Sequence, residues 1–395
     1  MATHQSLFKT NIPDPDDPYW MIRRIFIDIF QYKFVKLLLK LLLLCNTVLI
    51  ILQTVVLLEV FNAVFFIKYY MMYIASIYIW ITLYSISQME KSVSCGIRDL
   101  REWEVGTTDP VIEKLNRKKI FYENVFVIVH VLLATVTGIA YIIPDEKDKD
   151  FFLVWVVFER FFPVFANIIF LLCRLSFFVL PIIMLAPFHM IIYYCGYTRR
   201  KFTAFTKSLE DLNDGFDDVD PLKSVYDEEY QREITRRLKF CIRSHVRLYS
   251  INSQLLRDLS HYIFLYSIIG VLFAIGIVVY GVTFQSSSLE KYVRVLGLAF
   301  CFVFMFVHMI WVGQITEDTT SDLFEALKQT VWYYWNDKNK KIFLMFLLNG
   351  EKSFKMQYSE NVSVNYELGV SILKSIYSTI MVLANLKNNY SLEGN

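Results

Sequence analysis

Seven long apolar segments constrain the fold of this chain more than any other feature of its sequence. They lie at 35–58, 67–87, 120–143, 176–198, 261–284, 293–313 and 367–386. A helix of about 20 apolar residues crosses the hydrocarbon core of a bilayer and satisfies its own backbone hydrogen bonds there. Among 395 residues, 55% are hydrophobic and 17% are aromatic, which is untypical of a soluble domain. The chain is therefore predicted to be an all-α membrane protein with seven transmembrane helices.

A further apolar region, 151–175, differs from these seven. Its apolar character is broken by charged residues and a proline, namely Glu159, Arg160, Pro163 and Arg174. Unpaired charges are unfavourable in a lipid-exposed span. The pattern favours a folded loop that packs over the helix bundle, with an eighth span as the alternative.

The segment before the first span has an amphipathic pattern from Tyr19 to Lys33. A short helix with one apolar face and basic residues on the other lies in the interface of a membrane. We therefore expect a re-entrant or interfacial helix within a cytosolic N-terminal segment 1–34. Arg23 and Arg24 are expected to point toward the lipid headgroups.

The distribution of basic residues predicts the orientation of the helices. Most of the 40 Lys and Arg residues fall in the N-terminal segment or in the loops after the second, fourth and sixth spans. Because cytosolic loops are enriched in Lys and Arg, these segments are assigned to the cytosol. The N-terminus is then cytosolic and, after seven crossings, the C-terminus is extracellular. This is the reverse of a G-protein-coupled receptor.

The sequence contains none of the motifs that catalysis or metal binding would require. GxSxG, HExxH, a Gly-rich phosphate loop and paired intramembrane carboxylates are all missing. We therefore predict no enzyme activity, no cofactor and no metal, and we expect no nucleic-acid partner. The six scattered cysteines are expected to be free thiols. Five histidines without a partner at ligand spacing are expected to be satisfied structural residues: His130, His189, His245, His261 and His308.

The last span carries hydroxyl groups on one helical face. Ser371, Ser375, Ser378 and Thr379 share this face with Val382 and Leu386. Such a stripe suits the wall of a water-filled path, which the two aliphatic residues would close. Back-bonding of Ser and Thr to their own helix, or close packing of small residues, explains the stripe equally well. Lys374, about 80° away on a wheel of 3.6 residues per turn, is expected at the flank of a pore or against a neighbouring helix.

The outer halves of the second, third, fourth and sixth spans are rich in aromatic and aliphatic groups. A lining with few polar groups suits a small hydrophobic ligand, although an ordinary packed bundle has the same composition. The candidate ligand-binding residues are Tyr73, Ile77, Thr135, Gly138, Ile142, Phe178, Met184 and Phe300.

The last quarter of the chain resembles the C-terminal signature of the insect odorant receptors. The similarity lies in Gly313-Gln314, Glu317-Asp318, Asp322-Leu323, Ala326, Trp332, Lys340-Lys341, Phe343–Leu348, Ile372-Leu373-Lys374-Ser375, Tyr377-Ser378 and Met381-Val382-Leu383. The seven-span plan with a cytosolic N-terminus agrees with that family. Lys328 and Val312 depart from it, since the family often has Tyr and Cys there.

This resemblance implies an odorant receptor of the plasma membrane, in the dendrite of an olfactory neuron. It implies a ligand-gated, non-selective cation channel subunit in a heterotetramer with the shared co-receptor, opened by a small hydrophobic volatile. The last helix would line the pore, with Ser371, Ser375 and Ser378 on its wall. Its gate would lie at Val382 and Leu386, with Asn385 beside them.

The resemblance also implies how the single domain 1–395 is organised. Spans three to six, residues 120–313, would hold the ligand pocket and cytosolic anchor helices, and residues 314–395 a further anchor and the pore helix. The chain lacks the long loop of the co-receptor before span five, which favours an odorant-tuning subunit. A gustatory-type receptor channel and a non-channel metabotropic receptor are the alternatives.

Overall fold

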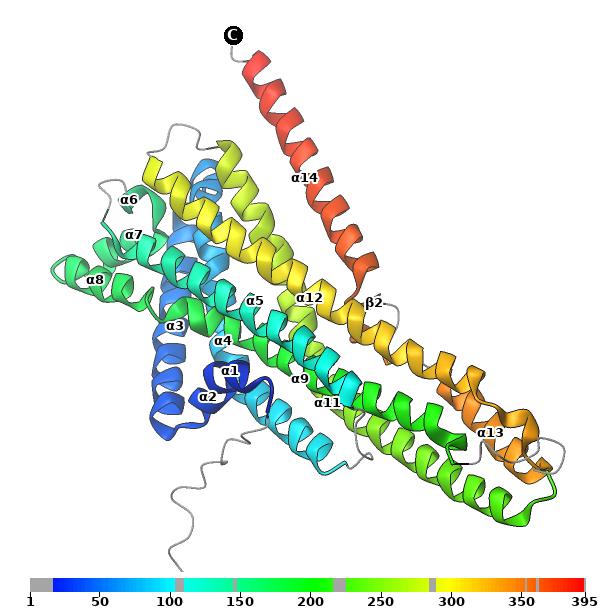
Figure 1. The fold of residues 1–395 in the computed structure, drawn as a ribbon. Helices are drawn as coiled ribbons and strands as arrows, with labels where there is room; N and C mark the ends of the chain where they lie inside the picture. Colours follow the sequence, from blue (N-terminus) through cyan, green and yellow to red (C-terminus); the bar gives the residue numbers. More distant parts are fainter. Residues whose placement is uncertain are drawn as a thin grey trace, which may run out of the picture.

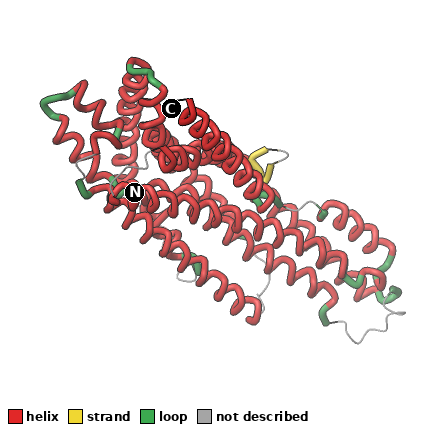
Figure 2. Tube along the Cα trace, turned by 90° about the horizontal axis from the view of Figure 1, so that it is seen from above, coloured by secondary structure: helices red, strands yellow, loops and turns green. Residues whose placement is uncertain are grey.

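The computed structural model describes residues 17–103, 110–144, 148–215, 225–283, 289–351, 354–359 and 362–393. Long helices running side by side dominate it (Figure 1), and the helical tubes fill almost the whole described chain in the second view (Figure 2). The long helices are α3 (Lys33–Glu59), α4 (Ala63–Arg101), α5 (Pro110–Ile142), α9 (Leu180–Glu210), α11 (Glu228–Thr283), α12 (Leu289–Gln329) and α14 (Tyr366–Glu393).

The predicted seven-helix membrane fold is confirmed. Among the described residues, 6 helices have the length and hydropathy to cross a membrane. The seventh, α14, has 28 residues and is about 42 Å long at 1.5 Å per residue, more than a bilayer core requires. The six cysteines, all of which the structure describes, are free thiols, as expected.

Several helices run far past their apolar segments. Helix α11 has 56 residues, about 84 Å at 1.5 Å per residue, and begins well before the span predicted at 261–284. Its extra turns are charged and are supported by pairs such as Arg237 Nε with Glu233 Oε1 at 2.9 Å. Together with the ends of α9 and α12, these turns extend from the bundle toward the lower right of Figure 1.

This extension has a buried polar centre of its own. Helix α13 (Asp337–Gly350) packs against α11 there, after the short helix η3 (Trp332–Tyr334). The Asn339 side-chain amide donates to the backbone and side-chain oxygens of Gln231, both at 2.9 Å. The Trp335 ring is fully buried and donates to Asn213 Oδ1 at 3.0 Å. Buried amides that are fully paired in this way fix the register of two helices.

The region 151–175 forms a folded connection, as expected, and not an eighth span. It contains α6 (Asp148–Phe151), α7 (Leu153–Phe161) and α8 (Ala166–Ser176). With 9 and 11 residues, α7 and α8 are too short to cross a bilayer. They pack against α3 and α5. A buried carboxylate at Asp148 pairs with both Arg174 and Arg294, which fastens this connection to α12.

The N-terminal helix exists, but the prediction for one of its basic residues was wrong. It consists of α1 (Trp20–Arg23), the π-helical η1 (Arg24–Asp28) and α2 (Ile29–Gln31). Its apolar face packs against α9 and is fully buried at Ile22 and Phe26. Arg23 is only 7% exposed and donates to Asp28 Oδ1 at 3.3 Å instead of facing headgroups. The sequence could not indicate that Arg23 is buried between this helix and the bundle, whereas Arg24 is exposed.

Candidate functional site

An apolar cavity lies in the half of the bundle nearest the folded connection. Its volume is about 120 Å³. Helices α4, α5, α9, α11 and α12 contribute to its wall. The lining residues are Met72, Ala75, Tyr78, Ile79, Ala134, Thr137, Gly138, Tyr141, Phe177, Leu180, Pro181, Met184, Leu185, Phe273, Leu298, Cys301, Phe302 and Met305.

The few polar groups of this wall already have partners within the protein. The Tyr78 hydroxyl donates to the Met184 carbonyl oxygen at 2.9 Å. The Thr137 hydroxyl donates to the Leu133 carbonyl oxygen at 2.9 Å, within its own helix. The Tyr141 hydroxyl donates to the Arg294 carbonyl oxygen at 3.4 Å. A guest would therefore be held mainly by apolar burial and ring contacts.

Arg294 lies beside Tyr141, at the end of the cavity next to the folded connection. Its guanidinium lies 5.8 Å from the centre of the Tyr141 ring, which lines the cavity. It donates to Asp148 Oδ1 at 2.6 Å and to the carbonyl oxygens of Ala140 and Ile143. An arginine in an otherwise apolar span is expected to face the protein interior. That signal in the sequence points to this end of the cavity.

Two of the eight candidate ligand residues, Gly138 and Met184, line the cavity. A Cβ atom at Gly138 would lie 2.4 Å from the Phe177 carbonyl oxygen, so glycine allows the backbone of the folded connection to approach α5. Phe178 and Phe300 are 55% and 63% exposed and point away from it. Tyr73 instead bonds the hydroxyl of Thr54 on α3 at 2.9 Å. The remaining three, Ile77, Thr135 and Ile142, are half-buried outside the lining.

A second, larger cavity adjoins the first. Its volume is about 500 Å³, and it lies between α11, α12 and the first turns of α14. Three side chains line both cavities: Tyr78, Phe302 and Met305. On the far side it reaches Leu368, Ile372 and Ile376 of α14. A thin wall of three side chains thus separates the first cavity from a cleft at the foot of the last helix.

Helix α14 stands away from the bundle over most of its length (Figure 1). Ser375, Ser378 and Thr379 donate to carbonyl oxygens four residues earlier, at 2.9 to 3.0 Å. This is the back-bonding that the sequence left open, and it does not consume the lone pairs of the hydroxyl oxygens. Val382 is 59% exposed, and Ser371 and Lys374 are exposed as well. The side chains of Asn385 and Leu386 lie outside the described residues.

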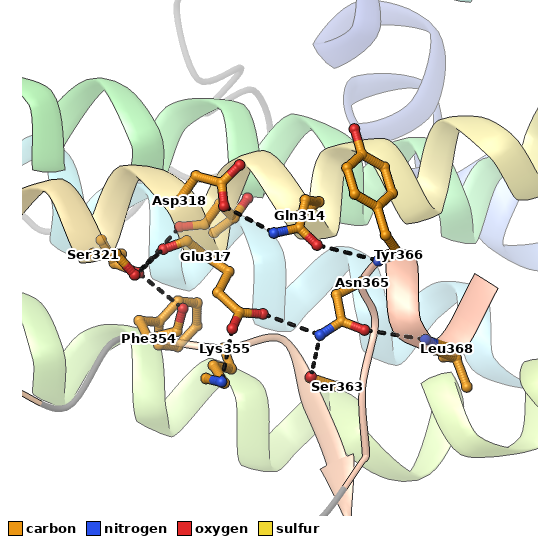
Figure 3. A network of polar contacts seen from close by, with 12 residues as sticks. Gln314, Glu317, Asp318, Ser321, Phe354, Lys355, Ser363, Asn365, Tyr366 and Leu368 are labelled. Carbon is orange, nitrogen blue, oxygen red and sulfur yellow. Dashed lines mark hydrogen bonds and ion pairs between the residues drawn. The ribbon is translucent and has the colours of Figure 1, made fainter. Parts of the chain in front are cut away.

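A set of polar contacts fixes the start of α14 to α12 (Figure 3). Asn365 caps the helix by accepting from the Leu368 N–H at 3.1 Å, and its amide donates to Glu317 Oε2 at 3.3 Å. The Gln314 side-chain oxygen accepts from the Tyr366 N–H at 3.2 Å. Lys355 pairs with Glu317 at 2.7 Å. The short hairpin of β1 (Gln357–Ser359) and β2 (Val362–Ser363) leads into this joint.

The joint explains a motif that the sequence singled out without a role. Gln314 and Glu317, two of the signature residues, hold the foot of α14. At Gly313 a Cβ atom would lie 1.9 Å from the Val364 carbonyl oxygen, so only glycine lets that strand pass. We define the pore-helix joint as Gly313, Gln314, Glu317, Asn365 and Tyr366.

The description of the three buried histidines as satisfied structural residues was wrong. His189 and His308 have no hydrogen-bond partner among the described residues at either ring nitrogen, and His130 has one only at Nε2. Within the described residues, no group of His, Cys, Asp and Glu has an arrangement that could hold a metal ion.

The family model described as 7tm Odorant receptor matches residues 58–377. The chain therefore belongs to the odorant receptor family. None of the curated proteins compared with the sequence matches it.

Two solved structures share the fold. One is the insect olfactory receptor OR5 from Machilis hrabei, with a TM-score of 0.66 and 10% identity over 93% of this chain and 96% of that one. The other is the same receptor in complex with eugenol, with a TM-score of 0.65 and 10% identity over 93% and 97% of the two chains. At this identity the likeness establishes the fold alone.

Proposed function

We propose that this chain is the odorant-tuning subunit of a ligand-gated, non-selective cation channel, which assembles with the shared co-receptor in the plasma membrane. The observation that carries this proposal is the thin wall of Tyr78, Phe302 and Met305 between the first apolar cavity and the cleft at the foot of α14. A ligand in the first cavity contacts side chains that also line the cleft at the foot of the helix with the hydroxyl stripe.

The composition of the cavity favours a small, uncharged, hydrophobic volatile. Burial of apolar area stabilises a complex by about 25 cal/mol per Å², and the wall offers few unpaired polar groups for specificity. Shape then selects the ligand. The receptor that shares this fold has been solved with eugenol, a ligand of that chemical class.

Gating follows from the exposed position of α14. A helix with an exposed Val382 and a hydroxyl face needs neighbours, which other subunits of a tetramer would supply. An apolar constriction formed by Val382 and Leu386 excludes water until the helices move apart. A ligand that binds the open state more tightly shifts the population toward it.

The test is whole-cell current in cells that express the chain with the co-receptor, during exposure to a panel of volatiles and with G-protein signalling blocked. The expected result is a ligand-evoked cation current that persists under the block. Cells that express the co-receptor alone provide the baseline. A response that disappears under the block would instead identify a metabotropic receptor.

A further inference from the structure

Three buried histidines meet in the middle of the bundle, from three different helices. His130 of α5 and His189 of α9 are 0% exposed, and His308 of α12 is 1% exposed. The ring centre of His189 lies 5.3 Å from that of His130 and 6.3 Å from that of His308. We call these three residues the histidine layer.

The layer contains five ring nitrogens without a partner among the described residues. They are Nδ1 of His130 and both nitrogens of His189 and of His308. The sixth, Nε2 of His130, lies 3.2 Å from the Cys301 carbonyl oxygen. A neutral imidazole has one donor and one acceptor, and a buried polar atom without a partner carries its full desolvation penalty. So many bare nitrogens in one place call for a bound group.

Among the described residues, no protein group bonds to these five nitrogens. The rings that pack against it are apolar or aromatic: Phe26 against His189 at 4.4 Å, and Phe126 against His308 at 4.2 Å. A metal ion is not the guest, because no arrangement suited to one exists in the described part of the chain. The spaces between the rings suit a small neutral partner that both donates and accepts.

The layer lies directly beneath the first cavity. On each helix the histidine is one turn away from a residue of the cavity wall: His130 from Ala134, His189 from Leu185, and His308 from Met305. Residues three or four apart share a helical face. In the predicted orientation, each histidine is on the cytosolic side of its neighbour. Met305 is a flexible side chain between the cavity and the layer.

We infer that the histidine layer is a binding site for a neutral hydrogen-bonding oxygen. In the ligand-free protein that oxygen belongs to water, because a polar site with several unpaired groups is where buried water is retained. In the ligand-bound receptor, the hydroxyl or carbonyl oxygen of an odorant takes its place or bonds to it. This second role rests on the proposed function and makes oxygen-containing volatiles the preferred class.

The first arm of the test uses purified, ligand-free protein in detergent and needs no channel activity. The melting temperatures of H189F and H308F are compared with the unsubstituted chain and with H261F, since His261 is exposed. If water bridges the layer, each single substitution leaves the other two histidines without their hydrogen-bond partner. Tm then falls by at least 2 to 4 °C, a typical shift for loss of one such interaction. The triple variant H130F/H189F/H308F then recovers part of the loss.

If the nitrogens are bare, the same substitutions remove a penalty and raise Tm, which would overturn the inference. A lower Tm in the single variants together with recovery in the triple variant decides, because overpacking by the larger phenyl rings alone would lower the Tm of the triple variant further. If one single variant does not fold, the other one and the triple variant still give that comparison.

The second arm measures dose–response curves for a primary alcohol and for the alkane of equal heavy-atom count, with the co-receptor present. If an odorant oxygen reaches the layer, H308F reduces the preference for the alcohol over the alkane about tenfold. An unchanged preference together with a lowered Tm assigns the site to water alone. No response of the unsubstituted chain to any volatile would refute the proposed function, and the Tm arm would still judge the layer.

Discussion

Replacement of Met184 by a shorter side chain should shift the ligand preference toward molecules with a longer carbon chain. Met184 of α9 lines the first cavity, and M184A removes about three heavy atoms beyond Cβ. Each methylene that a ligand buries is worth about 0.8 kcal/mol, or about fourfold in affinity. A ligand two or three carbons longer than the original optimum could fill the new space. The half-maximal effective concentration of this longer ligand should then fall by as much as about 50-fold, while the original ligand should bind more weakly than before.

The assay is a dose–response series over straight-chain alcohols of increasing length, in cells that also express the co-receptor. Surface expression is measured in parallel, since a core methionine also contributes to stability. M345A is the matched control, because Met345 is 67% exposed on α13, far from the cavity. If both variants keep the original order of chain lengths, Met184 does not shape the ligand site and the cavity is not where the odorant binds.

Three further predictions concern the gate, the buried ion pairs of Asp148 and the cytosolic extension. V382A should raise the current without ligand, whereas V370A, on another face of α14 and also exposed, should not; equal currents would remove Val382 from the gate. D148N strands two buried guanidinium groups and should destabilise the protein by about 3–5 kcal/mol, seen as a lower Tm than that of the intact protein. Burial lowers the pKa of His245, so just below pH 6.5 the unfolded chain binds a proton at this histidine and the folded chain does not. The stability of the fold should therefore decrease as the pH drops. H245F should flatten the dependence of Tm on pH, and an unchanged slope would contradict this.

The membrane fold could be predicted from the sequence because segments that cross the lipid must be apolar, so hydropathy indicates where the spans lie. The folded connection at 151–175 was also predictable, since Arg160 and Arg174 are unfavourable in lipid. The length of α11 could not be predicted from the sequence. Its turns before residue 261 are charged, and hydropathy does not distinguish a charged helix from a loop.

The members of the cavity were hard to predict for a related physical reason. In a soluble protein the apolar face of a helix points inward, whereas in a bilayer both faces are apolar. Phe178 and Phe300 therefore looked like interior residues, although both are largely exposed in the structure. Gly138 was the better signal, because close backbone approach is a property of the interior alone.

The position of Gly313 allows ligand binding to be separated from gating. Helix α12 is continuous from Met305, in the wall shared by the two cavities, to Gly313 in the pore-helix joint, a distance of about 12 Å at 1.5 Å per residue. A rigid helix transmits a displacement of its wall to the foot of α14. In G313A the new Cβ meets the Val364 carbonyl oxygen, so the joint must open while the cavity stays intact.

The expected result is that a volatile still raises the Tm of purified G313A, as ligand linkage requires, while the evoked current is lost. G281A is the matched control, because nothing lies within 4 Å of a Cβ at Gly281, and it should keep both responses. Loss of the ligand-induced Tm shift in G313A would mean that the joint also shapes the cavity, against the coupling argued here. A normal current would mean that α14 moves independently of this joint, and the path from the cavity to the gate would have to run through α11 instead.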